Sequence, residues 1–458
     1  MKNLHYFPKT AIFVTMYRVA SDFFEEWKDS KYRKPLIVQG VRQVGKTYSV
    51  LEFGKKCFSN VAYLNFQTNP DLCRTFDEDI SPSYLIPLIS HICGCDVIAG
   101  KTLIFFDEVQ LCERALTSLK YFCEQASDYH VIAAGSLLGI AVNRQKFSFP
   151  VGKVDRYTMY PMNFSEFLIA SGEGDTVRQI RECFDTDTPM PQVLHNATLK
   201  LYRQYLITGG MPEAVSRYIE TDDFLQVRHV QRTILNDYLD DMSKYQSSSN
   251  EIAKTRLTYG TVSTQLSKKN TRFQYKIIKT GARAAEYENA IQWLISASLV
   301  SRIFRAEQIA KPLDNYKDID DFKIYLPDCG LLCAQKEIFP DDVLFDTGEI
   351  DDFKGSLAEN YVSSQLTANG FVPFYWRSEK GDYEIDFVIS VKGKLIPVEV
   401  KSSEHVTSDS LRYYTNRFCP DYSIRISTKN FGFENGIKSI PLYAVFCITD
   451  EPVRQGGN

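Results

Sequence analysis

Long apolar runs are missing from this sequence, and so is any strong excess of charge of one sign. No run reaches the roughly 18 apolar residues that a membrane-spanning helix needs, and the N-terminus lacks the apolar stretch of a signal peptide. The formal net charge is -4 over 458 residues, so any attraction to nucleic acid has to come from a local surface. We therefore expect a cytoplasmic protein without a membrane segment.

Patterns of cysteine that bind metal or form disulfide frameworks are also absent. The eleven cysteines are scattered without a CxxC pair, and the six histidines lie far apart. A zinc site is therefore not expected, nor is a disulfide framework in a chain of this length. With 44% hydrophobic and 24% charged residues, the composition is that of an ordinary globular protein.

Short apolar runs alternate with helix-length segments in the first third of the chain. Strands are expected at residues 35–40, 61–66, 102–107 and 130–136. This alternation predicts an α/β fold with a parallel sheet covered by helices on both faces. The pattern is helical from about 164, becomes basic from about 250, and returns to strands after about 325.

A complete phosphate-binding motif follows the first of these strands. The pattern GxxxxGK[ST] is matched by Gly40, Val41, Arg42, Gln43, Val44, Gly45, Lys46 and Thr47. A strand precedes the motif and a helical stretch follows it, which is the context that it requires. Backbone N–H groups and the helix N-terminus stabilise phosphate charge. We expect Lys46 to reach the β- and γ-phosphates of ATP and Thr47 to bind Mg²⁺.

Acidic residues end the strand at 102–107. Asp107 is expected beside the Mg²⁺ at Thr47, and Glu108 is expected to orient or deprotonate the attacking water. Ser136, at the end of the strand 130–136, could contact the γ-phosphate or the water, although a plain strand-end turn explains it equally well. Arg144 and Arg156 are candidates for an arginine finger, and either also fits an ordinary surface position.

Several segments together resemble the prokaryotic AAA-like ATPases often called the archaeal-type ATPase family. They are KPLIVQGVRQVGKT, FFDEVQ, AAGSLL, FPVGKVDRYTMYPMNFSEFL, ITGGMPEAV and FKIYLPDCGLL, so the resemblance spans nearly the whole chain. It implies an ASCE-type P-loop core with Asp107 and Glu108 in the roles given above. Many relatives carry Gly-Arg where this chain has Gly152-Lys153, so no arginine role is assigned there. Related ATPases often complete the site with a neighbour's arginine, which leaves a homo-oligomer open.

Basic side chains are concentrated between residues 252 and 305. A helix, a turn and a second helix running into an apolar segment suggest a winged helix–turn–helix, and the family resemblance agrees. The excess of Lys and Arg, with Phe273 and Tyr275 among them, fits a surface that contacts DNA phosphates. Winged helices also join domains or bind proteins, so a module that contacts protein partners is the alternative.

Two strands near the C-terminus are expected to pair through a turn at Lys392-Gly393. With a two-residue turn, counting outward places Asp386 opposite Glu399. Facing carboxylates repel each other, and a divalent metal between them, Mg²⁺ or Mn²⁺, would remove the repulsion. Lys401 shares a face with Glu399 and could position the nucleophilic water or stabilise the transition state.

The order Asp, then Glu-x-Lys, resembles the PD-(D/E)xK nuclease core. That core also has an acidic residue on a preceding helix, and Glu359 occupies the matching place, whereas Ile385 replaces the usual proline. The resemblance implies a nuclease site of Glu359, Asp386, Glu399 and Lys401. An exposed hairpin whose charges face water is one alternative, and a nuclease-like domain that binds DNA without cutting it is another.

These patterns divide the chain into four expected units. They are a P-loop ATPase core over 1–165, a helical lid over 166–248, a winged helix–turn–helix over 249–330 and an α/β nuclease-like domain over 331–458. The expected function is a Mg²⁺-dependent ATPase coupled to a module that acts on DNA. A nucleotide-dependent switch or scaffold for protein partners, with an inactive nuclease-like domain, is the alternative.

Overall fold

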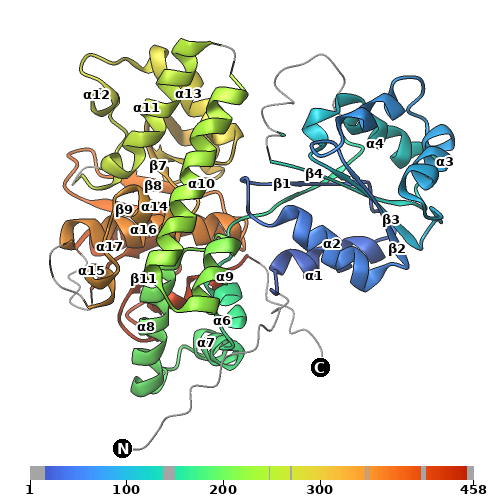
Figure 1. Ribbon diagram of the computed structural model, residues 1–458. Helices are drawn as coiled ribbons and strands as arrows, with labels where there is room; N and C mark the ends of the chain where they lie inside the picture. Colours follow the sequence, from blue (N-terminus) through green and yellow to red (C-terminus); the bar gives the residue numbers. More distant parts are fainter. Residues whose placement is uncertain are drawn as a thin grey trace, which may run out of the picture.

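The structure is a computed structural model in which the N-terminal core and the later elements form two sides of the molecule (Figure 1). It describes residues 16–136, 138, 150–246, 248–268, 271–345, 348, 350–403 and 409–450. The core contains the elements up to β5, and the other side contains the elements from α6 onward.

The core is built on a five-stranded sheet with the strand order β2-β3-β4-β1-β5. Its strands are β1 (Leu36–Gln39), β2 (Asn60–Asn65), β3 (Thr102–Asp107), β4 (His130–Gly135) and β5 (Asp155–Thr158). Every neighbouring pair is parallel, so the predicted sheet and its four strands are confirmed. The short edge strand β5 was not predicted, because its sequence DRYT has no apolar run and none of its residues is fully buried.

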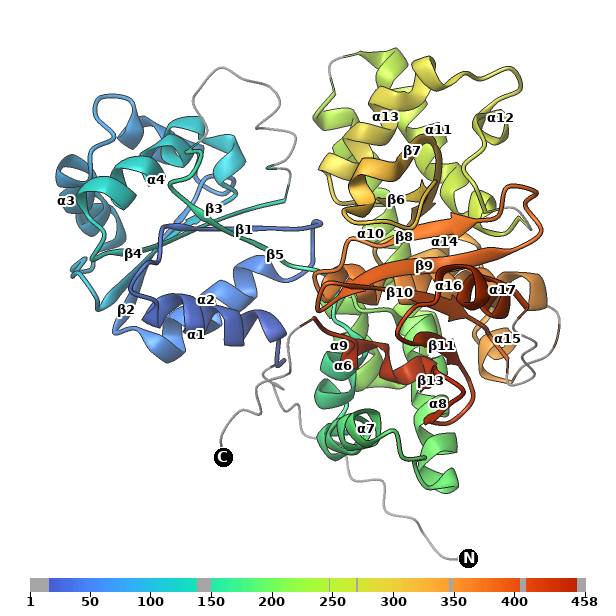
Figure 2. The ribbon, with the colours of Figure 1, turned by 180° about the vertical axis from the view of Figure 1, so that it is seen from behind.

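Helices cover both faces of this sheet (Figure 2). They are α1 (Val19–Asp29) and α2 (Lys46–Cys57) on one face, and α3 (Pro82–Cys93) and α4 (Glu113–Gln125) on the other. Alternate residues of β3 point to opposite faces. Phe105 therefore packs in the cluster that includes α1 and α2, and Phe106 packs in the cluster under α3 and α4.

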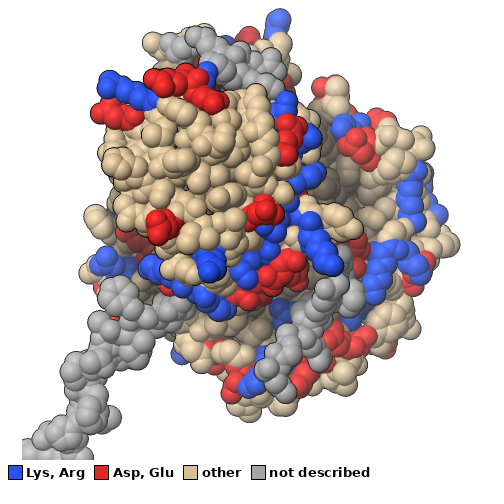
Figure 3. Space-filling view, turned by 90° about the vertical axis from the view of Figure 1, so that its right-hand side faces the viewer, with Lys and Arg blue, Asp and Glu red and all other residues tan. Residues whose placement is uncertain are grey.

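The outward face of the core has a wide area without charged side chains (Figure 3). No Lys, Arg, Asp or Glu occurs between residues 81 and 95, a stretch that contains α3. Ile92 and Ile98 are 42% and 47% exposed. Charged side chains border this area, so the core presents an uncharged outer surface with a charged margin (Figure 3).

Helices follow the core and lead away from it. They are α6 (Phe164–Ala170), α7 (Gly174–Thr186), α8 (Gln192–Thr208), α9 (Pro212–Thr221) and α10 (Phe224–Lys244). With 21 residues, α10 is about 32 Å long. It packs against α8 and α9 and continues to α11 (Ser249–Leu266). Helix α10 therefore connects the elements beside the core with those of the predicted winged helix.

A buried contact joins three distant segments next to these helices. Asp328 is 2% exposed, and its carboxylate accepts hydrogen bonds from the backbone N–H groups of Gly210 (2.6 Å) and Leu331 (2.8 Å). A Cβ on Gly210 would lie 2.0 Å from the carbonyl oxygen of Met162. The segments ITGGMPEAV and FKIYLPDCGLL therefore meet at this junction, which requires a residue without a side chain at position 210.

The remaining elements contain a mixed sheet of eight strands in the order β12-β13-β11-β10-β9-β8-β6-β7. Its strands are β6 (Ser301–Ala306), β7 (Lys317–Tyr325), β8 (Phe374–Arg377), β9 (Glu384–Val391), β10 (Lys394–Val400), β11 (Ser423–Ser427), β12 (Gly432–Glu434) and β13 (Ile437–Pro441). The helices of this half are α11, α12 (Tyr275–Ile278), α13 (Ala284–Ser296), α14 (Cys329–Gln335), α15 (Pro340–Leu344), α16 (Asp351–Ala368) and α17 (Asp409–Phe418).

The predicted boundary at residue 330 falls within this arrangement. The hairpin β6–β7 comes before residue 330, yet β6 pairs with β8 through Arg305 and Tyr375. The sheet therefore begins at Ser301 rather than after about 325. The bounds of the four expected units remain predictions. Among the described residues, no helix combines the length and apolar character needed to cross a membrane.

Candidate functional site

The phosphate-binding loop runs from the end of β1 into α2, and its two motif glycines have left-handed backbones. The φ angles are 143° at Gly40 and 92° at Gly45, which side chains rarely permit. A Cβ on Gly40 would also lie 2.1 Å from the carbonyl oxygen of Met159. Gly45 is the N-cap residue of α2. The loop geometry therefore requires both glycines where the motif has them.

Lys46 lies inside this loop and is only 6% exposed. Its Nζ donates hydrogen bonds to the carbonyl oxygens of Gly40 (3.0 Å) and Val41 (2.9 Å). Burial lowers the pKa of Lys46 to about 8, although the negative charges of Glu108 and Asp107 oppose the shift. The ammonium is thus held by the loop backbone, close to the two acidic residues that end β3.

Asp107 is 2% exposed at the carboxyl end of β3. Its Oδ2 accepts hydrogen bonds from the Thr47 hydroxyl (2.9 Å), the Tyr63 hydroxyl (2.9 Å) and the Asn65 amide (3.1 Å). All three donors are uncharged. The Thr47 hydroxyl and the Asp107 carboxylate are hard oxygen ligands that already adjoin each other, so these residues fit a Mg²⁺ ion.

Glu108 follows with a left-handed backbone, φ 53° and ψ 41°. A non-glycine residue in this region is strained by roughly 1–3 kcal/mol, and such strain concentrates at functional sites. The Glu108 Oε2 accepts a hydrogen bond from Gln110 Nε2 at 2.5 Å. A Cβ on Gly135 would lie 2.2 Å from Gln110 Oε1, so Gln110 packs against the end of β4 and positions Glu108. The sequence analysis did not identify Gln110.

The other predicted residues of this site have different outcomes. Ser136 is 8% exposed directly after β4, and its role stays a prediction. Arg156 lies on β5, where its backbone is paired with Ile37 of β1. Ile37 is three residues before the loop, which begins at Gly40. Arg144 lies outside the described residues. No arginine finger is assigned to either arginine.

Helix α10 contacts the loop directly, which was not predicted. Arg42 Nη1 lies 2.5 Å from Asp241 Oδ1, and Gln43 Nε2 lies 2.6 Å from Asp237 Oδ2. The Tyr238 hydroxyl donates to the Arg42 carbonyl oxygen at 3.1 Å. Burial lowers the pKa of Arg42, but the Asp241 hydrogen bond and the charges of Asp241, Glu108 and Asp237 produce a net rise.

A buried arginine supports the loop from the other side. Arg18 is 4% exposed and pairs with Glu166 at 3.0 Å. It also donates to the carbonyl oxygens of Val44 (2.8 Å) and Tyr160 (2.7 Å). Arg18 thus ties the loop to the start of α6. It was not predicted, because its partners are distant in sequence and its neighbours form no motif.

Comparison with family models gives three matches along the chain. Residues 32–168 match an AAA domain, and they include the loop, Asp107 and Glu108. The chain carries an AAA-family ATPase domain. Residues 199–342 and 354–445 match two domains of unknown function, DUF8612 and DUF4143. No curated protein matches the chain.

Solved structures give similarities of low TM-score. The Walker-type ATPase PABY2304 of Pyrococcus abyssi is 12% identical, with a TM-score of 0.44 and coverage of 70% of this chain and 96% of that chain. The Aeropyrum pernix ORC2 protein in ADPNP–ADP complexes is 12% identical, with a TM-score of 0.35 and coverage of 76% and 96%.

The predicted hairpin far from the AAA domain has the expected turn and register. Lys392 and Gly393 have φ angles of 48° and 72°, as a two-residue type I′ turn requires. Strands β9 and β10 pair from Val391 with Lys394 to Phe387 with Val398, and the next residues in this register are Asp386 and Glu399.

The four predicted nuclease residues meet near this hairpin. The Asp386 carboxylate accepts a hydrogen bond from the Val400 N–H at 2.7 Å, and Lys401 Nζ lies 3.3 Å from Glu399 Oε1. Burial raises the pKa of Asp386, and the negative charge of Glu359 raises it further. The positive charges of Lys323 and Lys401 oppose this rise. The sequence thus identified residues that come together in space.

A lysine that was not predicted occupies this cluster. Lys323 of β7 is 1% exposed, and its Nζ lies 2.8 Å from Glu359 Oε1 and 2.7 Å from Glu384 Oε1. The Tyr325 hydroxyl donates to the same Glu359 oxygen at 2.5 Å. The sequence feature that could have identified Lys323 is its position inside the apolar segment FKIYL. An internal ammonium therefore supplies positive charge within this cluster, between Glu359 and Glu384.

This arrangement does not fit a resident divalent metal at the hairpin. The ammonium of Lys323 already pairs with Glu359, and Glu399 is paired with Lys401. Within the described residues, no group of three or more His, Cys, Asp or Glu side chains is arranged to hold a metal ion. The second metal site remains a prediction without structural support.

The basic region around α11 to α13 is partly neutralised by acidic partners. Arg256 pairs with Asp240, Arg302 with Glu288, and Arg305 with Asp318. Phe273 is buried and stacks on Phe322, with ring centroids 5.3 Å apart, and Tyr275 packs against the same ring. Phe273 therefore packs inside the structure, and Tyr275 is half-buried against it. Exposed basic side chains remain at Lys276, Lys279 and Arg283.

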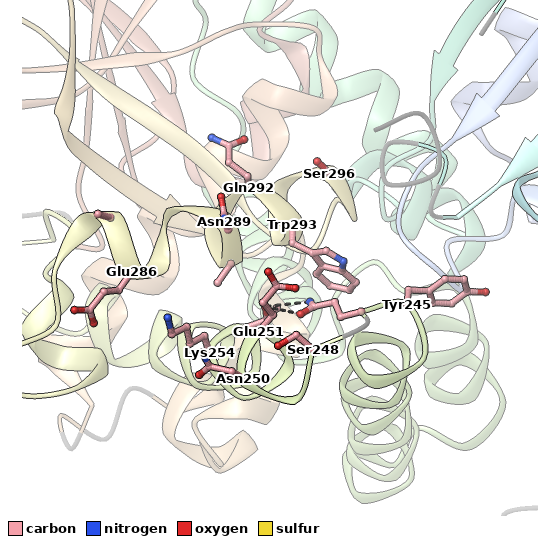
Figure 4. Close-up of a pocket in the computed structure, with 14 residues that line it drawn as sticks. Tyr245, Ser248, Asn250, Glu251, Lys254, Glu286, Asn289, Gln292, Trp293 and Ser296 are labelled. Carbon is pink, nitrogen blue, oxygen red and sulfur yellow. Dashed lines mark hydrogen bonds between the residues drawn. The ribbon is translucent and has the colours of Figure 1, made fainter. Parts of the chain in front are cut away.

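A polar pocket of about 670 Å³ lies between the end of α10, the start of α11 and α13. Figure 4 shows the side chains that line it, including Tyr245, Lys254, Glu286 and Trp293. Gln246 and Thr255 are joined across its floor by hydrogen bonds of 3.0 and 3.2 Å. The pocket thus lies where the helix that contacts the ATP site meets the predicted winged helix.

Proposed function

We propose that this chain is a Mg²⁺-dependent ATPase whose turnover controls a module that binds DNA. The observation that supports the ATPase most strongly is the direct contact between the Thr47 hydroxyl and the buried Asp107 carboxylate. A P-loop threonine and an aspartate at the carboxyl end of another strand of the sheet, here β3, are the pair that holds Mg²⁺ in such ATPases.

In this proposal the residues of the AAA domain have separate roles in ATP binding and hydrolysis. The loop backbone from Gly40 to Thr47 and the ammonium of Lys46 bind and orient the phosphates. Thr47 and Asp107 hold Mg²⁺, which neutralises phosphate charge when bound. Glu108, fixed by Gln110, accepts a proton from the attacking water, and Ser136 contacts the water or the γ-phosphate.

Two substitutions test the ATPase. Lys46→Ala should abolish tight ATP binding or turnover, because it removes the charge inside the loop. Glu108→Gln should still bind ATP but leave it unhydrolysed, because an amide cannot accept the proton. Measurement of bound nucleotide and released phosphate separates the two. Normal hydrolysis by Glu108→Gln would remove Glu108 from the catalytic role.

The DNA-binding part of the proposal rests on the exposed basic residues of the predicted winged helix. Lys276, Lys279 and Arg283 lie within eight residues of one another and are exposed. Their triple replacement by Gln should weaken DNA binding and reduce its salt dependence. A matched control replaces Lys31, Lys101 and Lys120, which are exposed on the N-terminal core. Absence of salt-sensitive binding in the native protein would favour the switch or scaffold for protein partners.

Metal-dependent DNA cleavage is the second candidate function. The hairpin register and the meeting of Glu359, Asp386 and Lys401 favour it, while the position of Lys323 argues against it. The test is cleavage of mixed DNA substrates with Mg²⁺ or Mn²⁺, with and without ATP. Cleavage that disappears in Asp386→Ala would establish a nuclease. No cleavage under any condition, with ATPase activity intact, would leave DNA binding or a scaffold role.

A further inference from the structure

Three side chains of helix α10 contact the phosphate-binding loop from one side. Asp237 and Asp241 are four residues apart and therefore share a helix face, and Tyr238 lies between them in sequence. Their partners are Gln43 and Arg42 of the loop. The Asp241 side chain is 8% exposed and that of Arg42 is 36% exposed. The arginine therefore has room to move, while the aspartate is enclosed.

Arg42 also lies close to the reacting end of the site. It directly follows Val41, whose carbonyl oxygen accepts the hydrogen bond from Lys46 Nζ at 2.9 Å, and the charges of Glu108 and Arg42 act on each other. Glu108 is the proposed base, so the guanidinium lies near the place where the terminal phosphate has to be attacked. Arginine binds phosphate through paired N–H donors. The terminal phosphate and the Asp241 carboxylate are therefore two anions that compete for one guanidinium.

We propose that Arg42 is the arginine that contacts the terminal phosphate of ATP within the same chain, and that it leaves Asp241 to do so. Asp241 is then a positioning residue that holds Arg42 in the arrangement seen here. The exchange releases α10 from the loop, since the approaching phosphates also repel Asp237. This inference rests on the proposed ATPase function and names an arginine inside the loop, which is a different candidate from Arg144 and Arg156.

The release of α10 has a consequence at the other end of the helix. The helix ends at Lys244, and the next residues, Tyr245 and Gln246, line the polar pocket (Figure 4). Trp293 of α13 lines the same pocket. Its indole Nε1 is buried and has no hydrogen-bond partner among the described residues. A shift of α10 therefore changes the surroundings of Trp293, which makes this residue a reporter of ATP binding.

Steady-state kinetics test the arginine. Arg42→Ala should lower kcat by about 100-fold, as removal of one transition-state donor typically does. Its affinity for ADP should stay within about twofold of the native protein, because ADP lacks the terminal phosphate. Asp241→Asn should bind ATP up to about tenfold more tightly, since the competing anion is gone. Asp240→Asn is the matched control, because Asp240 is its neighbour on α10 and its side chain is 83% exposed.

Tryptophan emission tests the movement of α10. A non-hydrolysable ATP analogue should change the emission of the native protein but not that of Trp293→Phe or Arg42→Ala, and ADP should produce a smaller change. Trp27 and Trp376 are 5% and 3% exposed, so they contribute a constant background. Arg42→Lys provides a second variant with retained charge, and it should recover part of kcat if Arg42→Ala folds poorly.

The outcomes separate this inference from the proposed ATPase. A native protein that does not hydrolyse ATP would refute the proposed function itself. Hydrolysis at the native rate by Arg42→Ala, in a native protein that is active, would overturn only the role of Arg42. Equal loss of ATP and ADP binding in Arg42→Ala would show a structural role in the loop and would also overturn it. An unchanged Trp293 emission on ATP binding would refute the release of α10.

Discussion

Replacement of Lys323 by methionine tests the charge arrangement around the C-terminal hairpin. Lys323 is 1% exposed and is the cation between Glu359 and Glu384, with Asp386 nearby. Methionine keeps much of the volume but removes the charge, which leaves buried carboxylates without their partner. Removal of one member of a buried ion pair destabilises proteins by about 3–5 kcal/mol.

The assay is urea unfolding followed by the fluorescence of Trp376, which lies in β8 of the same sheet. Lys323→Met should lower the unfolding free energy of this half by about 3–5 kcal/mol in metal-free buffer. Lys317→Met is the control, because it removes an amine from the same strand. The partner of Lys317 is Asp314, whose side chain is 70% exposed. Loss of such an exposed pair should change stability by less than about 1 kcal/mol.

Addition of Mn²⁺ makes the same variant informative about the nuclease resemblance. If the carboxylates can hold a divalent ion once the ammonium is gone, Mn²⁺ at 100 times its Kd should restore about 2.7 kcal/mol. The native protein should gain no stability, because Lys323 occupies the cluster. A variant as stable as the native protein would contradict the reasoning on the buried pair. Mn²⁺ stabilisation of the native protein would show that a metal can displace Lys323.

Two further predictions concern the ATP site and the core. The pKa of Lys46 is lowered to about 8 and ATP binding requires its ammonium form, so ATP affinity should fall as pH rises above 8. Calorimetry at pH 9 in buffers of different protonation enthalpy should detect uptake of nearly one proton on binding, and at pH 7 almost none. Gly210→Ala should destabilise the protein by about 1–3 kcal/mol, because its Cβ would lie 2.0 Å from a backbone oxygen. Gly260→Ala, in α11 with open space around it, should be neutral or stabilising by roughly 1 kcal/mol in urea unfolding.

Local patterns predicted much of the ATP site and of the hairpin. The loop from Gly40 to Thr47 follows a strand and begins a helix as expected, and Asp107 contacts Thr47. The turn at Lys392-Gly393 fixed the register, because side-chain direction and pairing follow from a two-residue turn. These features depend on residues that are close in sequence or on a motif with one known geometry.

The unpredicted parts depend on contacts between distant residues. Arg18 and Glu166 are 148 positions apart, and Arg42 and Asp241 are 199 apart. No spacing rule connects such residues. Lys323 lies inside an apolar strand, which is the usual sign of a buried and paired charge. Its partners on α16 and β9 became visible only when the fold brought Glu359 and Glu384 to it.

The continuation of β6 and β7 into the eight-stranded sheet constrains how mechanical work can pass through the molecule. Helices α11 to α13 are followed directly by this hairpin, and β6 pairs with β8. A rotation of these helices against the sheet would have to break backbone pairing between strands. The basic helices and the carboxylate cluster are therefore expected to move together, as one rigid unit. Under the proposed function, a displacement driven by ATP would then occur where α10 meets the AAA domain, and the predicted winged helix would move together with the hairpin.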